Sequence, residues 1–269
     1  MPESMPESLP ESRTGQRQLA FLSTENLEEF IVYDELTYAH FEALGWSVEA
    51  VPWRAGLDPD FDWSRFEMVI IRSPWDYQQE AELFLDALVR IDAGTRLENP
   101  LEVVRWNLQK GYLRDLEERG VPIVPTLFRD AGEPIDGSLL GRFEGANKVV
   151  VKPLVSGNAD HTYVLDAGTI EADGAHLTDI FASRAHLVQP FVPAILEEGE
   201  YSLFYFAGEF SHAILKTPKA GDFRVQEEHG GRIRGIEPDE TMLSAGQKAL
   251  EAIGRKLLYA RVDLVRGVV

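Results

Sequence analysis

The chain has 269 residues, and 44% of them are hydrophobic, so it is long enough to bury a sizeable core as one large domain or two. Its acidic side chains outnumber Lys and Arg by 45 to 26, which argues against duplex nucleic acid or an anionic membrane as the main partner. The absence of cysteine excludes disulfides, thiolate metal sites and a cysteine nucleophile, and no apolar run approaches the ~18–20 residues that cross a bilayer.

The chain begins with a threefold Pro-Glu-Ser repeat, "MPESMPESLPES". The repeat has low hydrophobicity, and it lacks the basic lead and apolar centre of a signal peptide. We therefore predict that residues 1–16 form a disordered tail. Together with the lack of cysteine, this start predicts a cytoplasmic protein.

Strand and helix patterns alternate between residues 17 and 100, which is typical of a small parallel α/β domain of Rossmann-like form. The predicted strands are "RQLAFLST" (17–24), "SVEAVPW" (47–53), "FEMVIIRSPWDY" (66–77) and "RLEN" (96–99). The predicted helices are 25–45 and 80–94, and each ends at a glycine.

The remainder reads as α+β, with antiparallel hairpins around one or two helices. A helix is predicted over 101–120 and another over 239–258. The predicted strands are an irregular or edge strand at 121–128, then 148–154, 162–165, 186–192, a hairpin over 201–216 that turns at "AGE", and a buried strand at 259–265.

Common nucleotide, zinc-protease and serine-hydrolase motifs are absent from the sequence. Yet the stretch "LKTPKAGDFRVQEEHGG" gathers Lys216, Lys219, Arg224 and His229 around glycines. Arginine offers a planar fork for phosphate or carboxylate, and lysine offers a compact charge. The stretch is either a local anion site or a solvated flexible loop.

Three further features admit both a functional and a structural interpretation. Lys152 ends an apolar strand before "LVSGNADH", where it could meet phosphate oxygens or simply extend over a polar turn. The acids that follow "HLVQPFVPAIL" could bind ribose hydroxyls beside a hinge that reads a base, or belong to an ordinary charged loop. Asp263, in the apolar strand "YARVDLV", could bind Mg²⁺ or pair with Arg261 or Arg266.

The segment "RSPWDY" stands at the carboxyl end of the third predicted strand, where α/β sheets usually bind ligands. Arg72 could clamp a substrate carboxylate, and Trp75 and Tyr77 could form an apolar wall. Packing of Trp75 at a domain junction is the alternative.

Taken in order, these segments resemble an ATP-grasp ligase of the glutathione synthetase and ribosomal-protein glutamate ligase type over residues 17–269. The segment "RSPWDY" is also similar to ATP-grasp enzymes that close a cycloserine-type ring. The resemblance implies an N-terminal domain over 17–100, an ATP-grasp domain over 101–269 with a lid at about 147–195, and a nucleotide between two β-sheets. It rests on the motifs "WNLQKGYLRDLEERGVPIVPT", "VVVKP", "LVQPFV", "EGEYSLFYF", "ILK", "DFRVQEEHGG" and "RVDLV".

The resemblance also implies roles for individual residues. Those expected around the nucleotide are the phosphate lysines Lys110 and Lys152, the mobile loop Ser156, Gly157 and Asn158, the adenine hinge Gln189, Phe191 and Val192, and Glu197 or Glu200 for the ribose. Those expected at the reacting groups are Lys216 and Arg224 near the transferred phosphoryl group and Asp263 for the metal.

One departure from the family concerns the metal site. The family normally adds a second acid and an asparagine, often as Glu-x-Asn, soon after the strand of Asp263, whereas this sequence stops at Val269. We therefore expect an interrupted C-terminal core.

The activity that the resemblance implies is ATP-dependent ligation of a small carboxylate to an amine through an acyl phosphate, with Mg²⁺ or Mn²⁺ as the metal and a possible homodimer. The alternatives are a degenerate or regulatory ATP-binding protein, an ATP-grasp kinase, and an α/β binding protein without nucleotide.

Overall fold

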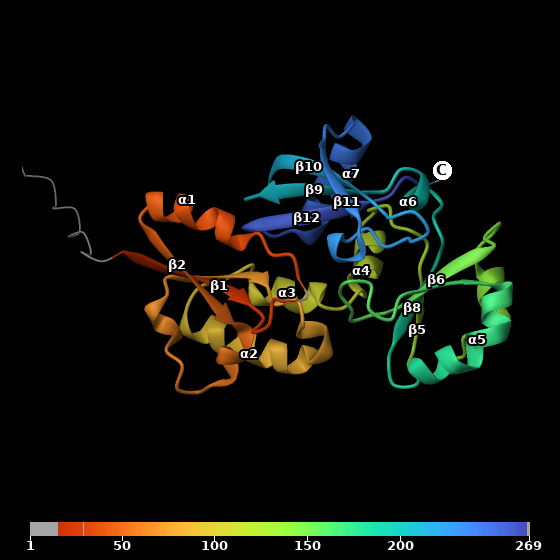
Figure 1. Ribbon diagram of the computed structural model, residues 1–269, viewed down its shortest axis with the longest axis horizontal. Helices are drawn as coiled ribbons and strands as arrows, with labels where there is room; N and C mark the ends of the chain where they lie inside the picture. The colour runs from red at the N-terminus through yellow and green to blue at the C-terminus, as the bar shows by residue number, and fades with distance from the viewer. Residues whose placement is uncertain (1–15, 29, 268–269) are drawn as a thin grey trace, which may run out of the picture.

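The computed structural model describes residues 16–28 and 30–267, which form three lobes (Figure 1). The N-terminal elements lie on the left of the figure, the sheet that contains β5, β6 and β8 lies on the right with α5, and β9–β12 lie at the top with α7. The predicted tail falls outside the described residues except for Gln16. None of the described helices has the length and apolar content needed to cross a membrane.

The N-terminal sheet is parallel throughout, in the order β2-β1-β3-β4, as the alternating pattern predicts. Its central strand is buried on both faces: Ala20 and Leu22 pack against one helix, while Leu19 and Phe21 belong to a second cluster. The elements are β1 (Arg17–Ser23), β2 (Trp46–Pro52), β3 (Met68–Ser73), β4 (Leu97–Glu98), α1 (Tyr38–Ala43), α2 (Ala81–Gly94) and the 3-10 turns η1 (Asp34–Thr37), η2 (Trp53–Leu57), η3 (Trp63–Arg65) and η4 (Tyr77–Gln79).

The helix predicted over 25–45 is wrong in its first half, because only η1 and α1 form after residue 33. The side chain of Asn26 accepts a hydrogen bond from the backbone of Glu28, a local turn that competes with helix. The backbone N–H of Ile31 donates to Glu228, far along the chain. This segment therefore gives its hydrogen bonds to a turn and to a tertiary partner.

The single helix predicted over 101–120 is divided into α3 (Leu101–Asn107) and α4 (Tyr112–Glu118). At the break, the backbone N–H of Lys110 donates to the carbonyl oxygen of Leu154 at 2.8 Å, a contact outside both helices. The break thus links the helical segment to the end of a strand in the second sheet.

The second sheet, here called the lid sheet, has the antiparallel order β5-β8-β6-β7. One of its faces is covered by α5, whose Ile170 and Leu177 share a cluster with Val149 and Val151. The sequence patterns did not predict α5, whose glycines and polar residues leave only a short buried stripe. The elements are β5 (Leu127–Arg129), β6 (Lys148–Pro153), β7 (Tyr163–Asp166), β8 (His186–Pro190), α5 (Ala167–Ile180) and η5 (Gly137–Arg142).

The third sheet, here called the core sheet, has the order β11-β10-β9-β12, and α7 covers one of its faces. The predicted hairpin forms, and its turn holds Ala207 and Gly208 at φ of 52° and 91°, the left-handed conformation that two-residue hairpin loops favour. The elements are α6 (Ala194–Glu197), β9 (Glu200–Phe206), β10 (Glu209–Thr217), η6 (Glu227–His229), β11 (Arg232–Ile236), α7 (Glu240–Ile253) and β12 (Tyr259–Leu264).

Candidate active site

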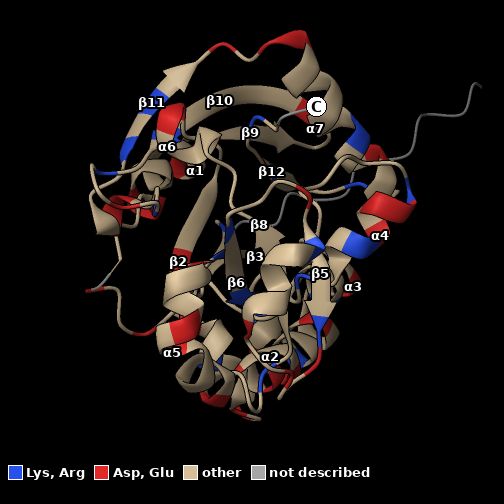
Figure 2. Cartoon of the chain, turned by 90° about the vertical axis from the view of Figure 1, so that its right-hand side faces the viewer, with Lys and Arg blue, Asp and Glu red and all other residues tan. Residues whose placement is uncertain are grey.

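The site is built from the faces of the lid sheet and the core sheet that carry no helix. Along a strand, side chains alternate between faces. Because Val149 and Val151 pack under α5, the lysines at 148 and 152 lie on the opposite face of β6. By the same argument, Leu203 packs under α7, and Ser202 lies on the other face of β9. Figure 2 shows the basic positions of β6 near the centre of the molecule.

Two lysines without an acidic partner stand at the lid side of this site. The ammonium group of Lys110 donates to the carbonyl oxygen of Ser156 at 3.0 Å and to its hydroxyl at 2.6 Å. Burial, and then the nearby charge of Lys152, lower the pKa of Lys110 to about 8. Burial also lowers the pKa of Lys152, and the negative charge of Glu200 on the core sheet opposes this effect. The two sheets therefore interact electrostatically across the site.

The core sheet contributes a paired cluster of charges. Lys216 and Glu200 are directly opposite residues of the β9–β10 ladder, and their charged groups are 2.6 Å apart. Asp263 is directly opposite Ser202, whose hydroxyl donates to the carboxylate at 2.5 Å. Lys216 lies 3.6 Å from Asp263, and Arg261 pairs with the same carboxylate at 2.9 Å. These contacts join both acids and both cations into one network.

The ionisation of Asp263 is decided by its two cationic neighbours. Burial alone raises the pKa of a carboxyl group. The charges of Arg261 and Lys216 outweigh that effect, so the pKa of Asp263 lies below its usual value. The carboxylate is therefore ionised at neutral pH.

The donor set fits a magnesium ion whose coordination is completed by a ligand. Mg²⁺ is usually held by one or two carboxylates together with phosphate oxygens and water. Asp263 and Glu200 supply two carboxylates around one ammonium group. Among residues 16–28 and 30–267, no group of three or more His, Cys, Asp or Glu side chains could hold a metal by itself. The protein thus offers part of a site and leaves the remainder to phosphate.

A hollow of about 380 Å³ lies between the lid and core sheets, next to the hinge that connects them. Lys148 and Val164 line it from the lid, Phe191 and Leu196 from the hinge, and residues 218–223 from the core. Lys148, which lines this hollow, and Lys152 are four residue steps apart on β6, a distance of about 13 Å along the strand.

The predicted hinge residues keep this end of the cleft in place. The N–H of Phe191 donates to the carbonyl oxygen of Lys148 at 3.0 Å, and the carbonyl of Val192 accepts from Ile195. The buried Gln189 donates to Thr126 at 2.9 Å. Their backbone and side chains therefore link β8 to neighbouring segments.

Not every candidate joins the charged network. The guanidinium group of Arg224 forms an ion pair with the carboxylate of Asp222 at 2.7 Å, and Asp222 is one of the residues that line the hollow. Glu197 is exposed at the end of α6, whereas Glu200 is paired with Lys216. The structure therefore brings Lys110, Lys152, Lys216, Glu200 and Asp263 together and leaves Arg224 and Glu197 at the rim.

The two substrate candidates lie at the carboxyl end of β3. The guanidinium group of Arg72 donates to the buried Asp34 at 2.6 and 2.9 Å, and Ser73 donates to the same carboxylate at 2.9 Å. Trp75 packs edge-to-face against Phe30, with ring centroids 5.5 Å apart. Both side chains thus have partners in the N-terminal lobe, and their substrate roles stay predictions.

The mobile-loop candidates meet the N-terminal and core lobes. Asn158 has a φ of 48°, and its carbonyl oxygen lies 3.4 Å from the imidazole Nε2 of His229. A Cβ atom added at Gly157 would lie 3.5 Å from the side-chain oxygen of Gln78. The loop therefore contacts elements on both sides of the site.

Sequence reasoning missed Ser202 and Tyr112, and it considered Arg261 only as a partner of Asp263, the contact that the structure shows. Burial and the charge of Asp263 raise the pKa of Tyr112, which places its phenol near the carboxylate. Ser202 is identified only by the register of β9 against β12, which sets it opposite Asp263. The sequence alone does not give that register.

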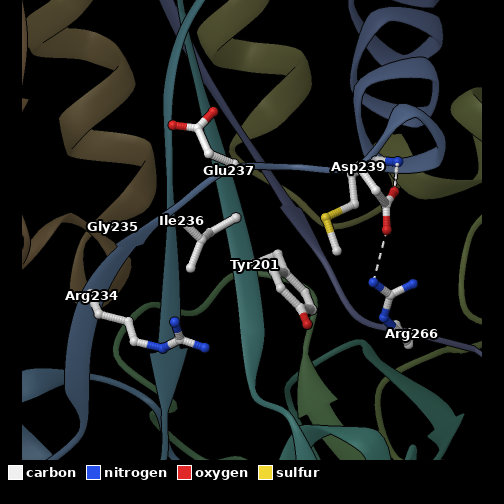
Figure 3. Close-up of a pocket in the computed structure, with 8 residues that line it drawn as sticks. Tyr201, Arg234, Gly235, Ile236, Glu237, Asp239 and Arg266 are labelled. Carbon is white, nitrogen blue, oxygen red and sulfur yellow. Dashed lines mark hydrogen bonds and ion pairs between the residues drawn. The ribbon is translucent and has the colours of Figure 1, made fainter.

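A second hollow, of about 580 Å³, lies on the α7 face of the core sheet (Figure 3). It includes Met242, which belongs to the cluster under α7, and Tyr201, which alternates with the network residues of β9. Arg266 at its edge is neutralised by Asp239 and Glu198, each at 2.8 Å. This hollow is therefore separate from the charged network.

Comparisons with known proteins agree with this arrangement. Residues 19–99 match the family model described as the D-cycloserine synthetase DcsG N-terminal domain. The chain is 33% identical over 236 residues to the cycloserine biosynthesis protein DcsG of Streptomyces lavendulae, covering 83% of this chain and 78% of that protein.

Solved structures show the same fold. The crystal structure of D-cycloserine synthetase DcsG has a TM-score of 0.80 and 30% identity, over 93% of this chain and 87% of that one. The ATP-grasp ligase PsnB, solved with Mg and ADP, has a TM-score of 0.62 at 16% identity, over 94% and 86% of the two chains, which shows the fold alone. The predicted ATP-grasp fold is confirmed, and the chain belongs to the ATP-grasp family that includes DcsG and is an ADP-forming carbon–nitrogen ligase.

Proposed function

We propose that this ligase activates the carboxylate of a small, amino-acid-like substrate and joins it to an amine of the same molecule, closing a cyclic amide. The observation that carries the proposal is the charged network between two facing sheets, together with the hollow of about 380 Å³ beside the hinge. The similarity to DcsG, a cycloserine biosynthesis protein, supports the substrate class. The proposed cofactors are ATP and Mg²⁺, with Mn²⁺ as a substitute that accepts the same oxygen ligands.

We place the adenine in the 380 Å³ hollow, against Phe191 and the backbone of Val192, with the buried Gln189 supporting the hinge. The ribose then faces Glu197, because Glu200 belongs with Asp263 to the carboxylate pair proposed for the metal. This orientation directs the phosphates along β6 toward the network.

The phosphates then reach Lys110 and Lys152, whose charges have no acid beside them on the lid side. The loop Ser156–Asn158, which Lys110 holds through Ser156, covers them. Asp263 and Glu200 would hold the metal ion, which would supply positive charge that neutralises the phosphates.

The reaction proceeds in two steps. A substrate carboxylate oxygen attacks the γ-phosphorus, the bond to ADP breaks, and an acyl phosphate forms. The amine nitrogen then attacks the acyl carbon, phosphate leaves, and the nitrogen loses a proton. Lys216 balances charge on the transferred group, and Arg224 approaches it from the rim loop.

The substrate lies between the network and the carboxyl end of β3, where we place Arg72 and Trp75 as carboxylate clamp and apolar wall. The lid, about residues 147–195, is part of the ATP-grasp domain 101–269. Its closure against the rest of that domain and against the N-terminal domain 17–100 excludes water from the acyl phosphate. The strongly acidic composition supports a cytoplasmic protein that binds neither nucleic acid nor membrane. We also propose a homodimer, as in related ligases.

The test is ADP release by the purified chain with Mg-ATP and a panel of amino acids that carry a second amine. We expect a product lighter than its substrate by one water, and Mg-ATP should raise the melting temperature. The variant Lys152→Ala should lose that thermal shift, whereas Lys248→Ala, an exposed lysine of α7, should keep it. A phosphorylated substrate as the only product would refute ligation.

A further inference from the structure

Three segments from the three lobes meet beside the charged network. They are η4 of the N-terminal lobe, the loop that holds Gly157, and the residues around η6 of the core. Gln78 of η4 touches Gly157, and His229 of η6 contacts the carbonyl oxygen of Asn158. The hydroxyl of Tyr33 also donates to Glu227 of η6 at 3.1 Å, closing the contact between the N-terminal lobe and the core.

Two half-buried glutamines at this junction have a side-chain oxygen that is shielded from solvent and has no hydrogen bond. The side-chain oxygens of Gln78 and Gln226 have no partner among the described residues. Buried polar atoms nearly always have one, so an unpaired pair in one region needs an explanation. The other buried unpaired atoms belong to Trp63, Arg129, His186 and Tyr205. These four lie in elements of single lobes, whereas the two glutamines lie where lobes meet.

Gln78 also lies beside the loop that binds a lysine of the site. A Cβ atom added at Gly157 would lie 3.5 Å from the side-chain oxygen of Gln78, and the preceding residue, Ser156, accepts two hydrogen bonds from Lys110. On the opposite side, the backbone carbonyl of Gln226 accepts the N–H groups of His229 and Gly231, which fixes Gln226 at the start of η6. Gln78 and Gln226 therefore belong to the two segments, η4 and the start of η6, that lie against the loop of residues 156–158.

We propose that Gln78 and Gln226 determine specificity by accepting hydrogen bonds from the amine of the amino-acid-like substrate; this inference rests on the proposed function. Around the network, Lys110, Lys152 and Lys216 would repel an ammonium group, so an amine needs acceptors on the side away from them. A carboxylate there would hold the amine in its protonated form. A neutral amide oxygen accepts the same hydrogen bond and leaves the nitrogen free to lose its proton and attack.

The test uses Gln78→Met and Gln226→Met, which keep an unbranched side chain and remove the amide. The matched control is Gln79→Met, because Gln79 is an exposed residue of the same turn. With Mg-ATP saturating, we expect KM for the amine-bearing substrate to rise about tenfold or more in both variants. The thermal shift caused by Mg-ATP should stay that of the wild type. Gln78→Asn, which keeps the amide but shortens it, replaces Gln78→Met if that variant does not fold.

A fourth variant separates substrate contact from a structural role. Gln78→Glu should move the rise of kcat/KM to higher pH, because the new carboxylate raises the pKa of the substrate amine. Unchanged KM and an unchanged pH profile in the Gln78 and Gln226 variants, with an active wild type, would overturn this inference alone. No ADP release by the wild type with any amino acid of the panel would overturn the proposed function and this inference with it.

Discussion

The affinity for Mg-ATP should fall as pH rises through about 8, because the pKa of Lys110 is lowered to about that value. Below it the ammonium group is charged and attracts phosphate. Above it the amine is neutral in the free protein, and binding must first draw a proton from solvent. Among the described residues, the ammonium group of Lys110 donates to Ser156 and forms no ion pair with an acid.

The size of the effect follows from the titration. With a pKa of about 8, Lys110 is about nine-tenths charged at pH 7 and about one-tenth charged at pH 9. If only the charged form binds phosphate, the apparent Kd rises about tenfold between these pH values. Because the group has a lower pKa in the folded state than its ordinary 10.5, the free protein should also gain stability as pH rises from about 8 to 10.5.

The assay is calorimetric titration of Mg-ATP from pH 6.5 to 9.5 in buffers of equal ionic strength. Lys110→Arg should flatten the curve, since a guanidinium stays charged throughout this range. Lys110→Met should bind weakly at every pH. An identical decline in the wild type and in Lys110→Arg would refute the reasoning, because another group would then be titrating.

Three further results are expected. Asp263→Asn should lower the free energy of unfolding by about 1–2 kcal/mol, less than the loss of a fully buried ion pair, because about a third of the Asp263 side chain is exposed. Urea denaturation identical to that of the wild type would contradict this. Gly199→Ala should lower the melting temperature far more than Gly208→Ala. Both glycines have a positive φ, but of the two only Gly199 would place a Cβ atom 2.3 Å from a backbone oxygen, that of Lys216. Equal melting temperatures of the two variants would contradict this prediction. Asn99→Ala should lower the melting temperature of the whole chain, because it removes two 2.8 Å hydrogen bonds to the start of β12, and hydrogen exchange should show that strand less protected.

The parts that the sequence predicted well depend on local periodicity. Runs such as 148–153 and 259–264 combine β-branched residues with clear ends, so their strands appear where predicted. The parts predicted wrongly depend on distant partners. The N–H of Lys110 at the break donates to Leu154, and the N–H of Ile31 donates to Glu228, so no window of local sequence contains these partners.

The same distinction applies to the site. Lys152 and Asp263 stand at the ends of recognisable strands, so their neighbourhood could be expected from the resemblance. Arg224 pairs with Asp222 within its own loop, and its separation from the network was not foreseen. Gln78 has no motif at all, because its importance comes only from burial beside a loop of another lobe.

The distribution of charge across the cleft decides where each ligand group belongs. On the core side, Lys216 and Arg261 are matched by Glu200 and Asp263, so that side is close to neutral and has oxygen donors. On the lid side, neither Lys110 nor Lys152 forms an ion pair with an acid among the described residues. Burial lowers the pKa of both lysines, because it makes their charged forms less favourable.

Phosphate relieves that cost on the lid side, and a cation that accompanies it is drawn to the carboxylates on the core side. The acidic surface does not oppose this, because exposed charges are screened within about 10 Å while those in the cleft are not. Binding must also replace the two hydrogen bonds from Lys110 to Ser156. On the proposed function, arrival of phosphate and rearrangement of that loop are therefore coupled, because both involve the ammonium group of Lys110.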